Sequence, residues 1–252
     1  LDSIALVKQI QADSIAAVEA AQRMSSDTAS VAQVAAAPVS IYKDSLLEAA
    51  HSAEAQIVTL ANDKFEVAFT TKGAQPYSVK INEYSSYGGG ELFIFKPEMS
   101  RYDIQVYAGE TINTADFNFV VAEKTDTSLA MRLPFAGGGY IEQRYSIAEG
   151  SYSVKNYLSF VGMENVIPKN VFSFDVDYFV TMPRMEKGYK SEVQYSKLDY
   201  YFNGEKKPEA IAKGRSAQKR VDARVSWFAF QQQFFSAIMR SPQEFASADF
   251  AL

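Results

Sequence analysis

The stretch Lys64-Phe-Glu-Val-Ala-Phe-Thr70, KFEVAFT in one-letter code, indicates the fold class of this chain. Phe65, Val67 and Phe69 alternate with Lys64, Glu66 and Thr70, so the apolar side chains fall on one face of an extended segment. Such alternation is typical of an antiparallel strand that has one face in a core and the other face in solvent.

The same two-residue period returns later in the chain, in a run of Tyr152, Val154, Leu158 and Phe160 and in a run of Phe172, Phe174, Val176, Tyr178 and Val180. Turn signals separate the runs, at Gly88-Gly-Gly90, Gly137-Gly-Gly139, Glu149-Gly150 and Asn203-Gly204. We count about a dozen strands, with no βαβ alternation and no repeat of 20–50 residues. The pattern therefore predicts a mainly β fold, a large antiparallel β-sandwich over residues 57–252.

The composition excludes several classes of function. The 18 Phe and 15 Tyr among 252 residues favour β structure, and a net charge of −5 argues against a dedicated nucleic-acid binder. The absence of Cys removes disulfides, thiolate catalysis and Cys-based metal sites, and the single His, His51, leaves little room for imidazole chemistry.

Residues 1–56 differ from the remainder because they are rich in Ala, Ser, Gln and Val and contain one aromatic residue, Tyr42. We expect a helical or flexible arm close to a membrane, with a short helix that Asp44 caps at its N-terminus. No apolar run approaches the roughly 20 residues that span a bilayer. The chain begins at Leu1, and we interpret it as a piece whose targeting information lies outside it.

The stretch Trp227 to Met239, WFAFQQQFFSAIM, holds the only Trp of the chain. On a helical wheel Trp227, Phe230, Phe234 and Ile238 share one side, which predicts a C-terminal amphipathic helix over residues 220–239. Gln231 falls within the apolar arc of that helix, so its amide must find buried hydrogen-bond partners.

A basic stretch precedes the aromatic segment. A contact with anionic lipid or with an acidic partner is one interpretation of this stretch, and a solvated loop is the other. Its candidate contact residues are Lys213, Arg215, Lys219, Arg220 and Arg224.

Motifs for catalysis are scarce. Strand-like residues follow the glycine triplets, so these are hairpin turns and not phosphate-binding loops. Asp175 and Asp177 share one strand face without a third ligand nearby, and we interpret them as a solvated edge. A paired-carboxylate glycosidase site stays open, because its geometry is three-dimensional. We expect no catalytic residue, no metal and no cofactor.

Two stretches resemble one known family. The stretch from Asn62 to Val79, NDKFEVAFTTKGAQPYSV, followed by Tyr84, resembles the opening strands of the large periplasmic domain of the YidC family of bacterial membrane protein insertases. The segment from Trp227 to Phe235 is similar to the W-x-A-x-x-Q-x-(Y/F)-F segment of that domain. Order and spacing agree over about residues 57–252, although Gly73-Ala74 stands where the family often has Gly-Gly.

The resemblance implies a β-supersandwich of the galactose-mutarotase-like type, placed at the periplasmic face of the inner membrane in a multi-pass protein. It implies a non-catalytic domain that assists the insertion and folding of nascent membrane proteins and contacts the Sec translocase subunits SecD and SecF. The candidate partner-binding residues are Trp227, Phe228, Gln231, Gln232, Phe234 and Phe235. Because the family's domain continues with further strands, we expect this copy to be truncated at its C-terminus.

Two other functions stay open. The first is a sugar-binding or carbohydrate-active mutarotase-like protein, which would hold sugars by stacking on Tyr and Trp rings. The second is a structural spacer that sets a distance from the membrane.

Overall fold

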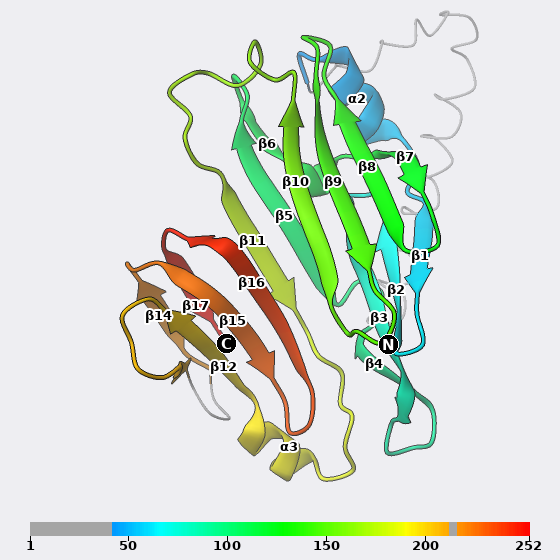
Figure 1. The fold of residues 1–252 in the computed structure, drawn as a ribbon, viewed down its shortest axis with the longest axis vertical. Helices are drawn as coiled ribbons and strands as arrows, with labels where there is room; N and C mark the ends of the chain where they lie inside the picture. The colour runs from blue at the N-terminus through cyan, green and yellow to red at the C-terminus, as the bar shows by residue number, and fades with distance from the viewer. Residues whose placement is uncertain (1–41, 212–215) are drawn as a thin grey trace, which may run out of the picture. The chain divides into compact units, whose positions relative to one another are not determined.

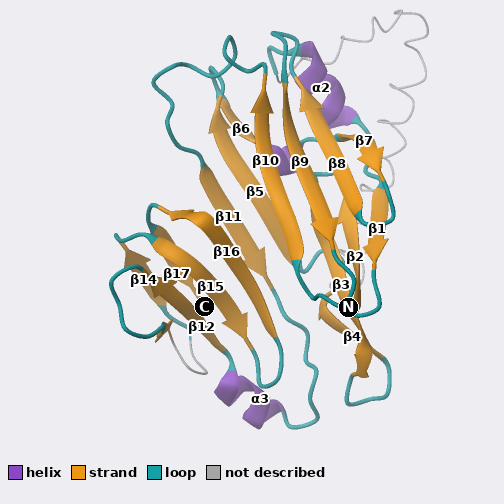
Figure 2. Cartoon of the chain, viewed as in Figure 1, coloured by secondary structure: helices purple, strands orange, loops and turns teal. Residues whose placement is uncertain are grey.

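The computed structural model of this chain describes residues 42–211 and 216–252. These residues form seventeen strands, β1 to β17, with two short α-helices and the 3-10 helix η1 (Thr114–Asp116) (Figure 1). All strand pairs are antiparallel, and strands dominate the cartoon (Figure 2). The prediction of a mainly β fold is confirmed.

Three sheets surround the first core. One sheet has the order β1–β2–β3–β4, with β1 (Ile57–Ala61), β2 (Phe65–Thr70), β3 (Gln75–Ser85) and β4 (Glu91–Phe95). A second has the order β10–β9–β8–β7, with β7 (Val120–Lys124), β8 (Ser128–Pro134), β9 (Tyr140–Ile147) and β10 (Val154–Val161). A third has the order β11–β5–β6, with β5 (Ser100–Tyr107), β6 (Thr111–Asn113) and β11 (Asp175–Val180).

The alternation that predicted β2 produces this first core. Phe65, Val67 and Phe69 are almost fully buried, and they pack in one cluster with Leu129 of β8 and Ile141 of β9. Two sheets therefore bury their apolar faces against each other, which is the defining contact of a β-sandwich.

Two further sheets surround a second core. One has the order β13–β12–β15–β16, with β12 (Lys197–Phe202), β13 (Glu209–Ile211), β15 (Val225–Gln231) and β16 (Ser236–Phe245). The other pairs β14 (Gln218–Val221) with β17 (Ala248–Ala251). The second core consists of seven buried residues: Leu198, Tyr200, Ile211, Val221, Val225, Phe228 and Phe250.

Two helices accompany the sheets. Helix α2 (Ser45–Ser52) starts at Asp44, whose carboxylate accepts hydrogen bonds from the Leu46 and Leu47 amides, as the sequence predicts. Leu47 and Ala50 join the first core, so the described part of the predicted arm packs on the sandwich and the helix belongs with it. Helix α3 (Tyr189–Tyr195) lies between β11 and β12. Residues 1–41, which contain most of the predicted arm, lie outside the described residues.

The predicted hairpin turns at Gly88–Gly90 and Gly137–Gly139 are confirmed, since they join β3 to β4 and β8 to β9. Gly139 has a φ of +79°, and a Cβ atom there would collide with the backbone carbonyl of Gly162. A glycine is therefore required at this position. Asn203-Gly204 also lies in a turn, within the connection of residues 203–208 that joins β12 to β13.

The turn from β2 to β3 passes through Gly73 and Ala74, both with positive φ, at 74° and 48°. A left-handed conformation favours glycine, because the Cβ atom of other residues approaches the backbone. A Gly-Gly pair would fit this turn with less strain than the Gly-Ala pair of this chain.

The predicted C-terminal amphipathic helix over residues 220–239 is wrong. The segment forms the end of β14, all of β15, a tight turn and the start of β16. Apolar residues occur on both faces of β15, so the run from Trp227 to Phe230 has no period of two, and the turn from Gln232 to Phe235 contains no Gly, Pro, Asn or Asp. Pairing with β12 and β16 satisfies the backbone of this segment in place of a helix.

Candidate functional site: the β15–β16 hairpin

The hairpin of β15 and β16 carries all the predicted partner-binding residues. Strand β15 lies between β12 and β16, and its register shifts between Val225 and Trp227. The shift is a β-bulge, and it allows Val225 and Phe228, three residues apart, to face the same core.

The inner face of β15 is aromatic. Phe228 is 9% exposed, and its ring lies 5.6 Å from that of Phe250 and 5.8 Å from that of Phe245. Phe230 lies 5.8 Å from Tyr178 of β11, where burial raises the Tyr178 pKa to about 12. Phe228 was a predicted contact residue, but its side chain belongs to the second core and stabilises the hairpin from within.

The outer face of β15 carries Trp227 and Gln231, because side chains alternate along a strand. The Trp227 ring lies 6.3 Å from the Tyr201 ring of β12, with 15° between the ring planes. Ile238 of β16 faces the same way as Ala229, its partner in the ladder, and its side chain is 67% exposed. Half-buried rings beside an exposed aliphatic side chain suit a contact with another macromolecule.

The turn is anchored at one end and exposed at its tip. Gln232 Nε2 donates to the carbonyl oxygens of Met182, at 3.4 Å, and Pro183, at 3.2 Å, in the segment after β11. Phe235 packs edge-on against Tyr84 of β3, whereas Phe234 is 67% exposed. The anchored amide is thus that of Gln232, and the prediction that Gln231 is the buried amide is wrong.

The Gln232 side chain also carries an unsatisfied group. Its Oε1 atom is the one side-chain N or O atom that is buried without a hydrogen-bond partner within residues 42–211 and 216–252. A buried acceptor without a donor costs about 1–3 kcal/mol. The Gln232 side chain therefore stabilises the fold less than an amide with all its hydrogen bonds would. The two hydrogen bonds from Nε2 offset part of the cost of burying Oε1.

The basic stretch is only partly described. Lys213 and Arg215 lie outside the described residues. Lys219 and Arg220 lie exposed on β14, and Arg224 is exposed in the loop before β15. Arg220 pairs with Asp222, at 2.8 Å, and with Asp249, and the Asp222 carboxylate raises the Arg220 pKa. These pairs compensate part of the positive charge, so Lys219 and Arg224 carry what remains in the described part.

The residues considered for catalysis are dispersed. Asp175 and Asp177 are exposed on β11, as predicted for a solvated edge. The His51 ring lies 5.3 Å from the Tyr42 ring and 6.2 Å from the Phe117 ring, as an aromatic contact of α2. Across the part of the chain that the structure describes, no three His, Cys, Asp or Glu side chains are grouped to hold a metal ion.

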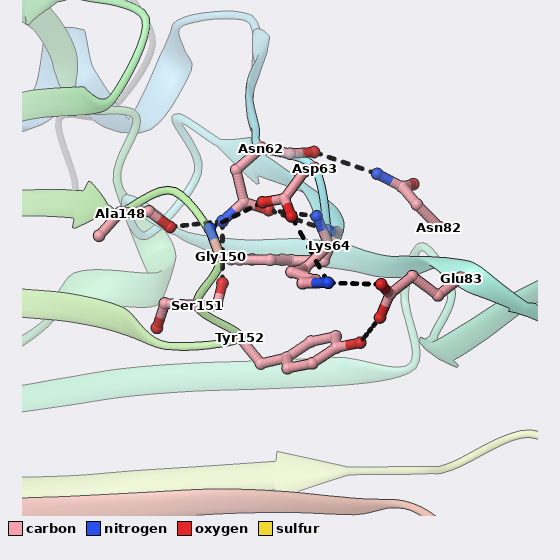
Figure 3. Close-up of polar contacts among 10 residues, drawn as sticks. Asn62, Asp63, Lys64, Asn82, Glu83, Ala148, Gly150, Ser151 and Tyr152 are labelled. Carbon is pink, nitrogen blue, oxygen red and sulfur yellow. Dashed lines mark hydrogen bonds and ion pairs between the residues drawn. The ribbon is translucent and has the colours of Figure 1, made fainter.

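The first family-like stretch forms a polar cluster at the β1–β2 turn (Figure 3). Asn62 Nδ2 donates to the carbonyl oxygens of Ala148, at 2.6 Å, and Ser151, at 2.8 Å, in the β9–β10 turn. Asn62 Oδ1 accepts from the amides of Lys64 and Phe65, which fixes the local turn. Asn62 therefore joins two sheets of the sandwich, a structural role that its motif in the sequence does not reveal.

Charged groups extend this cluster. Asp63 Oδ1 accepts from the Gly150 amide at 2.7 Å, and this hydrogen bond lowers the Asp63 pKa. Lys64 Nζ lies 2.5 Å from Glu83 Oε1, and the Tyr152 hydroxyl donates to the other Glu83 oxygen. The Lys64 hydrogen bond lowers the Glu83 pKa. Each charged group of this cluster has a partner within it: Asp63 bonds the Gly150 amide, and Glu83 bonds Lys64 and Tyr152. The cluster therefore holds the β1–β2 and β9–β10 turns together.

The hairpin offers aromatic and aliphatic side chains on one face and at its tip, and such a surface suits non-covalent contact with another macromolecule. No helix among the described residues is long and apolar enough to cross a membrane.

Comparison with known proteins agrees with the resemblance seen in the sequence. No family model matches the chain, but eight curated proteins do, and all are named membrane protein insertase YidC. The protein of Phocaeicola vulgatus is 28% identical over 248 residues, which cover 98% of this chain and 40% of that protein. The protein of Porphyromonas gingivalis ATCC 33277 is 25% identical over 245 residues, which cover 92% of this chain and 39% of that protein.

The predicted resemblance is thus confirmed over nearly the whole chain, which spans about 40% of the length of these relatives. Among solved structures, a galactose mutarotase-like protein from Lactobacillus casei shares 12% identity at a TM-score of 0.49, over 77% of this chain and 82% of that chain. Because this similarity is low, the assignment of a mainly β fold is based on the strands and sheets of the chain described above.

Proposed function

We propose that residues 57–252 form a non-catalytic periplasmic domain of a membrane protein insertase. In this proposal the domain, with helix α2 packed on it, stands at the periplasmic face of the inner membrane, and the residues before α2 link it toward the membrane. It assists the insertion and folding of nascent membrane proteins and contacts the accessory Sec subunits. The similarity of nearly the whole chain to proteins named as insertases supports the general function.

The observation that carries the contact role is the outer face and tip of the β15–β16 hairpin. Trp227, Ile238 and Phe234 present apolar surface there, while Gln232 and Phe235 hold the turn against other strands. A fixed backbone that displays aromatic side chains loses little conformational entropy on binding. Large aromatic side chains also dominate the binding energy of many protein interfaces.

The experiment that tests this proposal uses the full-length membrane protein and its Sec partners. We expect the double variant Trp227→Ala, Phe234→Ser to lower co-purification of SecD and SecF by about tenfold, because two interface anchors are lost. Tyr157→Ser on the outer face of the β7–β10 sheet is the matched control, since Tyr157 is also an exposed aromatic side chain. Equal co-purification of the wild type and the double variant would refute the contact role.

Sugar binding is a second candidate, which one observation favours. The nearly parallel rings of Tyr201 and Trp227 lie on an accessible sheet face, and such rings can stack on the apolar face of a sugar. A glycan array with the wild-type chain and Trp227→Ala separates the two functions. Binding that depends on Trp227 would establish sugar recognition, and its absence from the array would leave the insertase role as the function to test.

A further inference from the structure

A recess lies between the β3–β4 turn and the segment that follows β11. Its volume is about 210 Å³, and its lining includes Tyr87, Leu92, Phe93, Lys96, Arg184 and Met185. Leu92 and Met185 are buried at its base, whereas Lys96 and Arg184 are exposed at its rim. The recess therefore combines an apolar floor with two cations.

Hydrogen bonds fix the walls of this recess. The Tyr87 amide donates to the Met185 carbonyl at 3.1 Å, which joins the β3–β4 turn to the segment after β11. The Met185 amide donates to Glu192 Oε1 of α3 at 2.8 Å, and Glu192 is only 4% exposed. The β3–β4 turn thus meets a distant part of the sequence, the segment after β11 and the helix α3 that follows it.

Each cation is held over an aromatic ring. The Arg184 guanidinium carbon lies 4.9 Å from the centre of the Tyr87 ring, and Arg184 Nε donates to the Glu186 carbonyl at 2.8 Å. The Lys96 ammonium lies 5.8 Å from the centre of the Phe93 ring. Both distances lie within the range of cation–π attraction, which orients the two charges without neutralising them.

The positive charge at the rim lacks an acidic partner. None of the ion pairs among residues 42–211 and 216–252 includes Lys96 or Arg184. Glu91 also lines the recess, but its carboxylate lies 3.4 Å from the Lys80 ammonium. The recess therefore complements an anionic group.

Three exposed tyrosines lie on the β3–β4 hairpin and on α3, the segments that meet at this recess. Tyr84 and Tyr87 on the β3–β4 hairpin are each 55% exposed, and Tyr189 at the start of α3 is 63% exposed. Figure 1 shows the β3–β4 hairpin and α3 at the same end of the described structure, and the Met185 bonds connect them. Exposed tyrosine rings beside Lys and Arg are typical of protein surfaces at the membrane–water boundary.

We infer that this recess binds the phosphate-bearing head group of an anionic phospholipid and seats the β3–β4 hairpin and α3 on a lipid surface. The small volume fits a head group and is too small for a helix or a strand, which separates a lipid from an acidic protein. This inference goes beyond the proposed function, because lipid contact at the recess requires neither Sec binding nor client binding.

Vesicle co-sedimentation of the 252-residue chain tests this inference. Vesicles contain phosphatidylcholine alone or phosphatidylcholine with about a third phosphatidylglycerol, at low and high salt. We expect binding to the anionic vesicles only, a loss of binding at high salt, and about a fivefold weaker partition for Lys96→Gln or Arg184→Gln, as for one basic residue near an anionic surface.

Three controls keep the outcome decisive. Lys155→Gln on β10 removes a charge that is also exposed but does not line the recess, and should leave binding unchanged. The Lys96 carbonyl accepts from the Met99 amide, but the Lys96 ammonium makes no hydrogen bond among those found in the described residues, so Lys96→Gln reports on charge even if Arg184→Gln loosens the segment. Trp227→Ala should also leave binding unchanged, which separates lipid contact from the proposed Sec contact.

The remaining arms distinguish the sources of the anion. If inorganic phosphate at millimolar concentration displaced the anionic vesicles, or if phosphate bound in an Arg184-dependent way without vesicle binding, the recess would be assigned to a soluble anion. Either result would overturn the inference of a lipid head group. Stronger binding of a poly-glutamate peptide than of vesicles would assign it to an acidic protein. No vesicle binding by the wild type, or an equal loss for Lys155→Gln, would also overturn the inference.

Discussion

The first and second cores are both built from antiparallel strands but differ in size. Among the described residues, the first core contains 23 buried residues, and the Asn62 cluster joins the turns of two of its sheets. The second core contains seven buried residues, and the strands around Phe228 keep half-buried side chains on both faces.

We infer from this difference that the first region mainly stabilises the fold and the second mainly provides a contact surface. Complete burial of large apolar side chains stabilises the first region by about 1.5–3 kcal/mol per side chain. The second region leaves Trp227, Phe234 and Ile238 accessible, and that surface can be buried again by a partner. We therefore expect stability to depend mainly on the first region and contact mainly on the second.

The largest expected effect is a core truncation in the first region. Phe69→Ala should destabilise the chain by about 3–5 kcal/mol, because a fully buried ring is replaced by a cavity. Phe228→Ala in the second core should cost about 2–3 kcal/mol, since its smaller and more open core can relax. Urea unfolding followed by circular dichroism measures both values. A larger loss for Phe228→Ala would reverse the comparison.

The second prediction concerns the cluster that joins two sheets of the first region. Asn62→Ala removes two donors to the Ala148 and Ser151 carbonyls and should cost about 1–3 kcal/mol. Asn62→Asp keeps the Oδ1 acceptor for Lys64 and Phe65, but its second carboxylate oxygen would face the two carbonyl oxygens in place of a donor. Urea unfolding should therefore show a loss for Asn62→Asp at least as large as the loss for Asn62→Ala. Equal stability of wild type and Asn62→Ala would show that the cluster is dispensable.

The third prediction separates stability from contact in the second region. Trp227→Ala should cost about 1–2 kcal/mol, because the half-buried ring loses only part of its burial. Phe234→Ala should change the free energy of unfolding by less than about 0.5 kcal/mol, since the side chain is mostly in solvent. Thermal and urea unfolding of the purified chain check both values. A cost above about 3 kcal/mol at either position would place that ring in a core.

The smallest expected effect concerns pH. Partial burial of Glu142 raises its pKa, but hydrogen bonds from Arg132, at 2.7 Å, and Arg144, at 3.2 Å, outweigh it and lower the pKa below its ordinary value. Because the folded-state pKa is the lower one, this stabilisation is present above the unfolded-state pKa, about 4.3, and disappears as the pH falls through the folded-state value.

Glu142→Gln should therefore cost about 1 kcal/mol or less at pH 7, and the difference from wild type should shrink below about pH 4. Unfolding curves at several pH values measure it. Arg220→Gln in the second region is the control, because its pairs are exposed and screened by solvent and should leave the free energy of unfolding nearly unchanged. A difference that grows at low pH would contradict the assigned direction of the Glu142 shift.

Much of the first region could be predicted from the sequence because one face of each strand is apolar. Phe65, Val67 and Phe69 repeat at intervals of two, and Asp44 has the local chemistry of a helix cap. The β15–β16 hairpin could not be recognised, because apolar residues on both faces and a bulge after Val225 hide the period of two. A hairpin turn without Gly or Asn gave no signal of its end.

The candidate site was found only in part, for the same physical reason. The aromatic segment itself was recognised, and Trp227 and Phe234 are accessible, but the helical reading placed Phe228 at a contact and Gln231 in a buried arc. The amide that is anchored, Gln232, depends on the carbonyls of Met182 and Pro183, about fifty residues away. Contacts between such distant segments leave no local pattern in a sequence.

The most direct test of these two roles, stability in the first region and contact in the second, is hydrogen exchange of the full-length protein with and without membranes that contain the Sec accessory subunits. We predict that the amides of β8 and β9 exchange slowest in both states, and that those of β15 and β16 exchange faster in the free protein and slow down when the partners are present. The account would be contradicted if the amides of β15 and β16 exchanged as slowly as those of β8 and β9 and did not respond to the partners.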